Sequence, residues 1–202
     1  FSTVKAVINL CISEHGLQIN NPFGGVYIPQ DDLGTKRRPI PLEDIRSVQA
    51  ECLKYDDDQR WLIALISDSG MRLSEACGLL VEDIKLETDI PRIIVTPHPW
   101  RRLKTKGSTR QVPLVGSSLW AAESIVATAS NELAFPRYCD KIKVKANSAS
   151  GSLNKWLGAR VPDGCVVHSF RHSFRDRLRA AQCPSDIIDA LGGWSTAGIG
   201  SN

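Results

Sequence analysis

Two imidazoles and four guanidiniums fall within twelve residues near the end of the chain. Apolar side chains spaced three and four residues apart run through the same segment, which is typical of a helix with one buried face. On such a helix, His168 and Arg171 point together toward the helix start, where unpaired N–H groups add positive potential. A guanidinium fork matches phosphate geometry, so the segment predicts either an anion receptor or a solvated basic face. Its cationic members are His168, Arg171, His172, Arg175, Arg177 and Arg179.

Arg72 is a second candidate, in the segment Gly70-Met71-Arg72-Leu73-Ser74-Glu75. Gly70 is expected to end a helix that Asp57 or Asp58 caps and whose apolar side includes Trp61, Leu62, Leu65 and Ile66. A short helical segment should follow. An arginine at such a turn is either held by an acid such as Glu75 or presented at the floor of a cleft.

Basic residues without an intervening acid fill the segment 101–110. The β-prone runs 93–95 and 111–114 flank this segment, which predicts a hairpin with a cationic tip. The net charge of +3 is small, but local patches rather than total charge attract a polyanion. The basic residues are Arg101, Arg102, Lys104, Lys106 and Arg110.

Helical patterns account for most of the remaining chain. They cover 2–15, a segment opened by Pro41, 119–129, a segment around Leu153 and Trp156, and a short helix that Gly192-Gly193 ends. With 202 residues and 42% hydrophobic composition, the chain can bury a full core. We therefore predict an α+β fold that is mostly α-helical, with a small antiparallel β-sheet or hairpin at one edge.

The bulk composition excludes several classes of protein. The six cysteines contain no C-x-x-C pair, so neither a zinc site nor a disulfide framework is predicted, and reduced thiols in a cytoplasmic setting are expected. No apolar run reaches the roughly 20 residues of a membrane span, and the sequence does not open with a signal-peptide pattern. Turn-forming residues at 20–25 and 29–34 indicate a linker, with a domain boundary in the region 20–40.

Four segments, in this order, resemble the catalytic domain of tyrosine recombinases, the phage integrase family, from about Arg38 onward. Each segment is a weak indicator alone, and their order and spacing carry the resemblance. It implies that residues 1–20 are the last helix of an N-terminal core-binding domain, 21–38 a linker and 39–202 a catalytic domain. The segments are Gly70 to Glu75, Lys104-Thr105-Lys106-Gly107 ahead of Val112-Pro113-Leu114, His168-Ser169-Phe170-Arg171, and Leu191-Gly192-Gly193-Trp194.

The resemblance also implies a role for each catalytic candidate. Arg72 and Arg171 would stabilise charge on the non-bridging phosphate oxygens without a metal or any other cofactor, a task suited to preorganised donors. Lys104 or Lys106, with a slight preference for Lys104, would protonate the departing 5′ oxygen. His168 would act as base or hydrogen-bond partner of the attacking phenol, and Trp194 as a further phosphate donor. The implied DNA-contacting residues are Arg101, Arg102, Arg110, His172 and Arg175.

The family places its nucleophilic tyrosine nine residues after the His/Trp position, which corresponds to position 203. Tyr27, Tyr55 and Tyr138 are all far from that position. We therefore expect a catalytic domain truncated before its nucleophile, which binds and polarises a phosphodiester without cleaving it. The alternative is an inactive DNA-binding relic or regulator on the same scaffold, and a codon other than Tyr after Asn202 would favour it.

The implied function is site-specific recombination of duplex DNA through a 3′-phosphotyrosyl intermediate. The implied partners are double-stranded DNA, a homotetramer on synapsed sites, and directionality or host bending factors. The setting would be cytoplasmic and nucleoid-associated, in a bacterium or encoded by a phage, and the isolated 202 residues would be monomeric. A type IB topoisomerase would instead relax supercoiled plasmid without strand exchange, and a metal-dependent nuclease or phosphatase would need a carboxylate cluster that the sequence does not offer.

Overall fold

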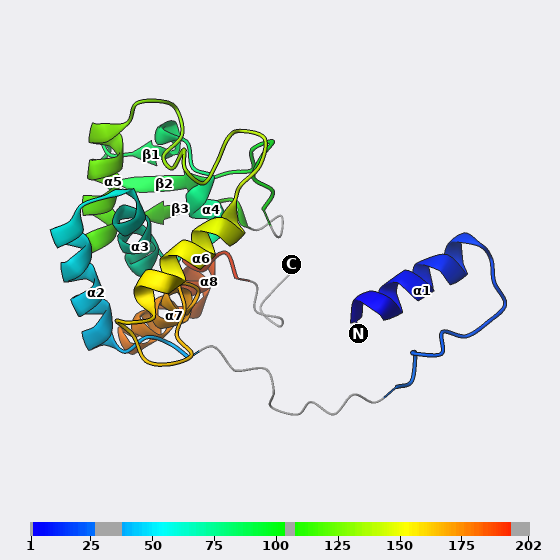
Figure 1. Cartoon of the computed structure of the whole chain (residues 1–202). Helices are drawn as coiled ribbons and strands as arrows, with labels where there is room; N and C mark the ends of the chain where they lie inside the picture. Colours follow the sequence, from blue (N-terminus) through cyan, green and yellow to red (C-terminus); the bar gives the residue numbers. More distant parts are fainter. Residues whose placement is uncertain (1, 27–37, 104–107, 195–202) are drawn as a thin grey trace. The chain divides into compact units, whose positions relative to one another are not determined.

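A computed structural model of the chain describes residues 2–26, 38–103 and 108–194. The chain divides into two compact units, Phe1–Lys36 and Arg37–Asn202 (Figure 1). The first unit contains one helix, α1 (Ser2–Glu14), and a turn held to it by a hydrogen bond from Lys5 Nζ to the carbonyl of Gly24 at 2.8 Å. Val4, Val7 and Leu10 of α1 are exposed. The predicted domain roles of 1–20 and 21–38 remain predictions.

The second unit is built around α3 (Asp58–Ser69), a helix that is buried over most of its surface. The side chain of Asp57 caps α3 by accepting a hydrogen bond from the backbone N–H of Arg60 at 3.0 Å. Of the two caps that the sequence predicts, Asp57 and Asp58, the structure shows Asp57. Around it pack α2 (Leu42–Tyr55), α5 (Gly116–Thr128) and α7 (Ser169–Ala180). A run of apolar residues without polar interruption, Leu62 to Ile66, explains why α3 is central.

A three-stranded antiparallel sheet lies at one edge of this unit (Figure 1). Its strands are β1 (Ile84–Lys85), β2 (Arg92–Val95) and β3 (Arg110–Pro113), and Ile93 pairs with Val112. The predicted hairpin of 93–95 and 111–114 is therefore confirmed, as is the mostly helical α+β fold with a small sheet at its edge. β1 was not predicted, because two residues are too short to show an alternating pattern.

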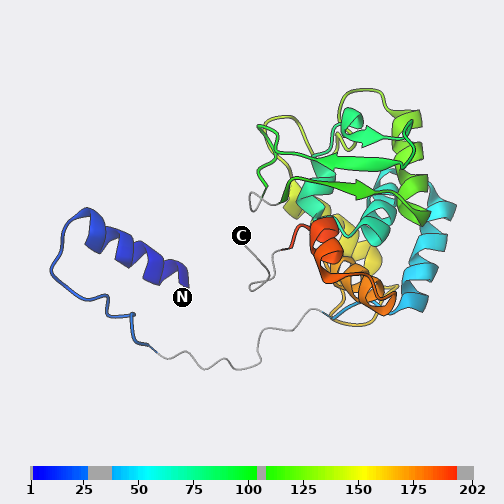
Figure 2. The same cartoon turned by 180° about the vertical axis from the view of Figure 1, so that it is seen from behind.

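The remaining helices bring the ends of several segments close to this sheet. A 3-10 turn, Val81–Asp83, follows α4 (Leu73–Cys77). α4 packs against α6 (Ala146–Leu157), and α8 (Ser185–Gly192) packs against α7 and β3. Figure 2 shows α8 beside β3, with α7 below it. The C-terminal end of α8 therefore faces both the sheet and the arginine-rich helix α7.

The turn between α3 and α4 is pressed directly onto α7. Gly70 ends α3 with a left-handed backbone, at φ of 61°. A Cβ on this glycine would lie 2.4 Å from Cδ1 of Phe174, closer than two carbon atoms can approach. Only glycine fits this contact, and it sets the position of Arg72 relative to α7.

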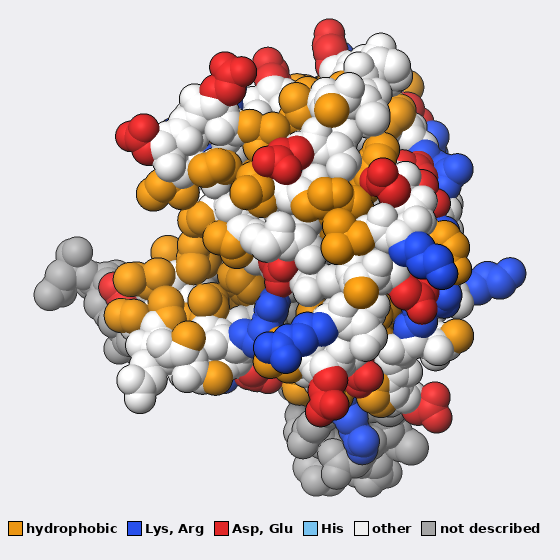
Figure 3. Space-filling view, turned by 90° about the vertical axis from the view of Figure 1, so that its left-hand side faces the viewer, with side chains coloured by type: hydrophobic (Ala, Val, Ile, Leu, Met, Phe, Trp, Pro, Cys, Tyr) orange, Lys and Arg blue, Asp and Glu red, His pale blue; other side chains and the backbone are white. Residues whose placement is uncertain are grey.

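The face formed by α2 and α5 mixes hydrophobic, acidic and basic side chains without a continuous basic field (Figure 3). Two basic residues of this part of the protein, Arg60 in α3 and Arg160 just after α6, are engaged locally. Arg160 pairs with Glu51 at 2.6 Å and lies over the Trp156 ring, and Arg60 pairs with Asp57 at 3.2 Å. This face is therefore not an obvious surface for a polyanion. Among the helices of the described residues, none has the length and apolarity needed to cross a membrane.

Candidate active site

Arg171 lies in the first turn of α7 and is 4% exposed. Its guanidinium donates to two carbonyls from distant segments, that of Gly70 at 2.7 Å and that of Gly192 at 2.5 Å. These bonds fix the side chain between the end of α3 and the end of α8. A guanidinium has five N–H donors, so donors remain for a ligand after both carbonyls are satisfied.

Arg72 approaches the same place from the turn before α4. Its guanidinium pairs with Oε1 of Glu75 at 2.6 Å and donates to the carbonyl of Gly193 at 3.1 Å. The sequence left open whether Arg72 is held by Glu75 or presented at a cleft, and both are true. Its side chain is 19% exposed and lines a pocket.

Glu75 is the carboxylate that connects two of the arginines. Its side chain is 3% exposed, and Oε2 accepts from Arg110 at 2.8 Å and from the backbone N–H of Arg72 at 3.0 Å. Burial alone would raise the pKa of Glu75, but hydrogen bonds and charge from Arg110, and then Arg72, hold it below its ordinary value. Glu75 is therefore ionised at neutral pH and anchors both guanidiniums.

Arg110 does not contact solvent as a DNA-binding residue would. Besides its pair with Glu75, it donates through Nε to the carbonyl of Leu191 at 2.8 Å and through Nη1 to that of Ser108 at 2.9 Å. It is 9% exposed. These internal bonds hold the guanidinium of Arg110 inside the protein, and its contact with DNA stays a prediction.

Three consecutive carbonyls at the end of α8 thus accept hydrogen bonds from three arginines of three different elements. Leu191 accepts from Arg110 of β3, Gly192 from Arg171 of α7, and Gly193 from Arg72 of the α3–α4 turn. The last carbonyls of a helix have no partner within the helix and carry partial negative charge. Cations are therefore favoured there, and the helix end holds the arginines as one group.

Trp194 covers this group. The guanidinium of Arg171 lies over the indole ring, 4.2 Å from the ring centroid. The guanidinium of Arg175 lies 5.2 Å from the same centroid. A Cβ on Gly192 would lie 1.8 Å from the indole ring, so the ring can fold back only over glycine. Cation–π contact adds to the fixing of Arg171. Arg175 also approaches Asp189 at 3.6 Å, so it is part of this packing, and its contact with DNA stays a prediction.

The cations in this group repel one another. Burial, and then the charge of Arg72, lower the pKa of Arg171 to about 9. Arg171 remains protonated at neutral pH, and its charge is only partly compensated by Glu75. A bound anion would relieve this repulsion, so the electrostatics favour a phosphate or a similar group beside Arg171.

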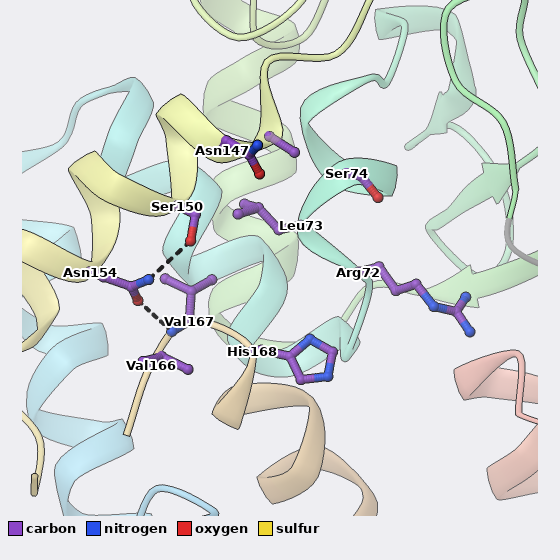
Figure 4. A pocket seen from close by; sticks show the side chains of 10 residues that line it. Arg72, Leu73, Ser74, Asn147, Ser150, Asn154, Val166, Val167 and His168 are labelled. Atoms are coloured by element: carbon purple, nitrogen blue, oxygen red, sulfur yellow. Dashed lines mark hydrogen bonds between the residues drawn. The ribbon is translucent and has the colours of Figure 1, made fainter. Parts of the chain in front are cut away.

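His168 lies at the start of α7, on the rim of a pocket of about 400 Å³ that Arg72 also lines (Figure 4). His172, one turn later and exposed, contacts the His168 ring edge-on with ring centroids 5.3 Å apart. The far wall of the pocket is α6, from which Asn147, Ser150 and Asn154 contribute polar side chains. The structure therefore brings together Arg72, His168, Arg171 and Trp194 from three segments.

The basic segment 101–110 is less exposed than the sequence predicts. Arg101 is 2% exposed and donates to the carbonyls of Glu75 at 3.0 Å and Thr96 at 2.6 Å. It also pairs with Asp83 at 3.4 Å, so its guanidinium is held in the interior, and its contact with DNA stays a prediction. Arg102, its neighbour, is exposed as expected. Lys104 and Lys106 lie outside the described residues.

Sequence reasoning missed the roles of Glu75, Ser150 and Asn154. Glu75 was considered only as a partner of Arg72, and nothing in its local pattern signals a second bond to Arg110, which is 35 residues away. Asn147, Ser150 and Asn154 are spaced three and four residues apart, which indicates one polar stripe on α6. That stripe was detectable from sequence, although its proximity to His168 was not. Among the described residues, no group of three or more His, Cys, Asp or Glu is placed to hold a metal ion.

A mostly helical domain with a small antiparallel sheet at its edge is the fold of the tyrosine recombinase catalytic domain. The chain belongs to the phage integrase family, which it matches over residues 43–199. It is similar to a tyrosine recombinase XerC of Psychromonas ingrahamii, with 25% identity over 166 residues that cover 79% of this chain and 52% of the relative. The chain thus spans about half the length of that relative.

Two solved structures show the same fold at low sequence identity. The Tn1549 transposon integrase in complex with circular intermediate DNA has a TM-score of 0.68 at 19% identity, covering 97% of this chain and 70% of that one. A lambda integrase tetramer bound to a Holliday junction has a TM-score of 0.64 at 13% identity, covering 100% of this chain and 59% of that one.

Proposed function

We propose that this protein is a site-specific DNA recombinase that cleaves and rejoins duplex DNA through a 3′-phosphotyrosyl intermediate. The observation that carries the proposal is the joint fixing of Arg72 and Arg171 by adjacent carbonyls at the end of α8, beside His168 and Trp194. Two guanidiniums that are already held in position can stabilise the charge that develops on the non-bridging oxygens of the phosphate. Donors of this kind are worth about 3–4 kcal/mol each in the transition state.

The proposed reaction starts with attack of a tyrosine phenol on the scissile phosphorus. The phenol proton passes to His168 or to a group that it orients, and the P–O bond to the 5′ oxygen breaks. Lys104 or Lys106 protonates that oxygen. The new phosphotyrosine ester retains the energy of the broken phosphodiester, so the reverse attack by a 5′ hydroxyl rejoins DNA without a nucleotide cofactor. We place the tyrosine at position 203, nine residues after Trp194.

The solved structures support the proposed partners. The Tn1549 integrase structure contains DNA, and the lambda integrase structure is a tetramer on a Holliday junction. We infer that this protein likewise acts on duplex DNA as a tetramer with its sites synapsed, aided by directionality or bending factors. A bacterial cytoplasm, with the protein at the nucleoid, is the setting that this substrate implies.

The test is a suicide DNA substrate incubated with the full-length protein. We expect a covalent adduct that disappears when the tyrosine proposed at position 203 is replaced by phenylalanine, and that Arg171→Ala reduces at least a hundredfold. Arg179→Ala is the matched control, since Arg179 is an exposed cation farther along the same helix. An adduct that survives the phenylalanine replacement would refute the mechanism. DNA binding without any adduct would favour the inactive DNA-binding relic.

A further inference from the structure

The pocket beside the arginine group extends well past the residues that a single phosphate would contact. Arg72 and His168 lie on one side, and α6 forms the other side (Figure 4). Its apolar lining comes from Leu73, Ala146, Val166 and Val167. None of the described residues that line it is acidic. A volume of about 400 Å³ with an apolar floor, polar side chains on α6 and positive charge at one end suits a sugar joined to a phosphate.

Asn154 organises the polar wall of this pocket. Its Oδ1 accepts a hydrogen bond at 2.8 Å from the backbone N–H of Val167, the residue before His168. Because that N–H can only donate, the amide orientation is determined, and Nδ2 must face Ser150. Nδ2 donates to Ser150 Oγ at 3.0 Å (Figure 4). One side chain therefore joins α6 to the turn that positions His168.

The same bond fixes the role of the Ser150 hydroxyl. A serine hydroxyl has one donor and two acceptor positions, and here Oγ accepts from Asn154. Within the described part of the chain, this is the one hydrogen bond that the Ser150 side chain makes, and its own proton has no acceptor there. Ser150 lines the pocket, so its proton is available to an acceptor oxygen that enters the pocket.

We propose that this pocket holds the sugar-phosphate of the nucleotide next to the scissile phosphate, with Ser150 Oγ donating to one of its oxygens and Asn154 as a positioning residue. The inference rests on the proposed function, because Arg72 and Arg171 hold the scissile phosphate. It adds a second subsite on the same DNA strand. The apolar floor contacts the deoxyribose, and the phosphate end lies toward the polar side chains of α6.

The experiment compares two ligands by NMR titration of the 202-residue chain. Inorganic phosphate probes the arginine group alone, and deoxythymidine 3′,5′-bisphosphate carries a sugar and a second phosphate. We expect the bisphosphate to bind wild type at least tenfold more tightly than phosphate does. Ser150→Ala should weaken bisphosphate binding roughly tenfold, as expected for the loss of a hydrogen bond to a charged oxygen. It should leave phosphate binding unchanged. Ser152→Ala, on the same helix but not among the pocket-lining residues, should change neither.

A coupling measurement tests the role of Asn154. Asn154→Ala should reduce the affinity for the bisphosphate relative to phosphate. The double variant Ser150→Ala/Asn154→Ala should lose no more of this relative affinity than the single variant with the larger loss. A purely structural effect would not produce this non-additivity. Equal affinity for the two ligands in wild type, or equal effects of Ser150→Ala and Ser152→Ala, would overturn the pocket inference while leaving the phosphate site intact. If neither ligand binds, or if Arg171→Ala leaves phosphate affinity unchanged, the phosphate site and the pocket are both refuted.

Discussion

Glu75 is a buried carboxylate between two arginines, so its ionisation connects the site to pH. Its pKa is lower in the folded protein than its ordinary value of 4.5. A lowered carboxyl pKa contributes to the free energy of unfolding above the unfolded pKa, and this contribution is lost as pH falls through the folded pKa. Acid therefore weakens the anchor of Arg72 and Arg110 before it affects the arginines themselves.

Replacing Glu75 by Gln should lower the free energy of unfolding by about 3 kcal/mol at pH 7, because the buried guanidinium of Arg110 and the partly buried one of Arg72 lose their counter-charge. The difference between variant and wild type should shrink as pH falls below about 4.5, because the unfolded chain then binds a proton at Glu75 that the folded protein binds only at lower pH. Urea denaturation between pH 3 and pH 7 measures both. A difference that stays constant over this range would contradict the role of the ionised carboxylate.

Adjacent arginines in the basic segment should behave differently. Arg102→Ala should weaken duplex DNA binding and reduce the salt slope of log K by about 1, with no change in melting temperature, because Arg102 is exposed. Arg101→Ala should cost about 3 kcal/mol of stability, since it removes the donor to the carbonyls of Glu75 and Thr96 and one of the partners of Asp83. Fluorescence anisotropy at several salt concentrations and thermal melts separate the two. Similar DNA-binding losses in both folded variants would show that Arg101 also contacts DNA.

At the scale of elements, the contact between Gly70 and Phe174 determines how the α3–α4 turn meets α7. Gly70→Ala should destabilise the protein by about 2 kcal/mol or more, because the new Cβ meets the Phe174 ring and the residue has a left-handed backbone. Gly151→Ala is the matched control. Gly151 lies within α6, and a Cβ at this position would have no other atom within 4 Å. Alanine there should therefore raise the free energy of unfolding, by at most about 1 kcal/mol. Chemical denaturation of both variants is the measurement.

The sequence predicted elements better than it predicted which side chains reach solvent. The helices, the Asp57 cap, the Gly70 stop and the hairpin each follow from local patterns of periodicity and turn residues. The burial of Arg101 and Arg110 depends on carbonyls and carboxylates that are brought near by folding, such as Glu75 and Leu191. A local pattern carries no information on such distant partners. Local patterns therefore could not predict that Arg101 and Arg110 are buried. The assignment of Arg72 and Arg171 as phosphate donors came from the family resemblance and remains a prediction.

For the whole molecule, the division at residue 36 predicts independent stability of the larger unit. The hydrophobic core among the described residues runs from Ile40 to Phe170, and none of it comes from the first unit. Removing residues 1–36 should therefore leave the melting temperature unchanged within about 2 °C. Circular dichroism melts of both forms provide the comparison, and a large drop in melting temperature would show that α1 stabilises the larger unit.

The hydrogen bonds from three arginines to the end of α8 have a further consequence for the thermodynamics of ligand binding. Ordering a long side chain at a binding site costs about 0.5–1.5 kcal/mol of conformational entropy. Arg72 and Arg171 are already held by the carbonyls of Gly193 and Gly192 before any ligand arrives. Their ordering belongs to the folding of the chain, so a phosphate that binds here meets receptors whose conformational entropy has already been lost.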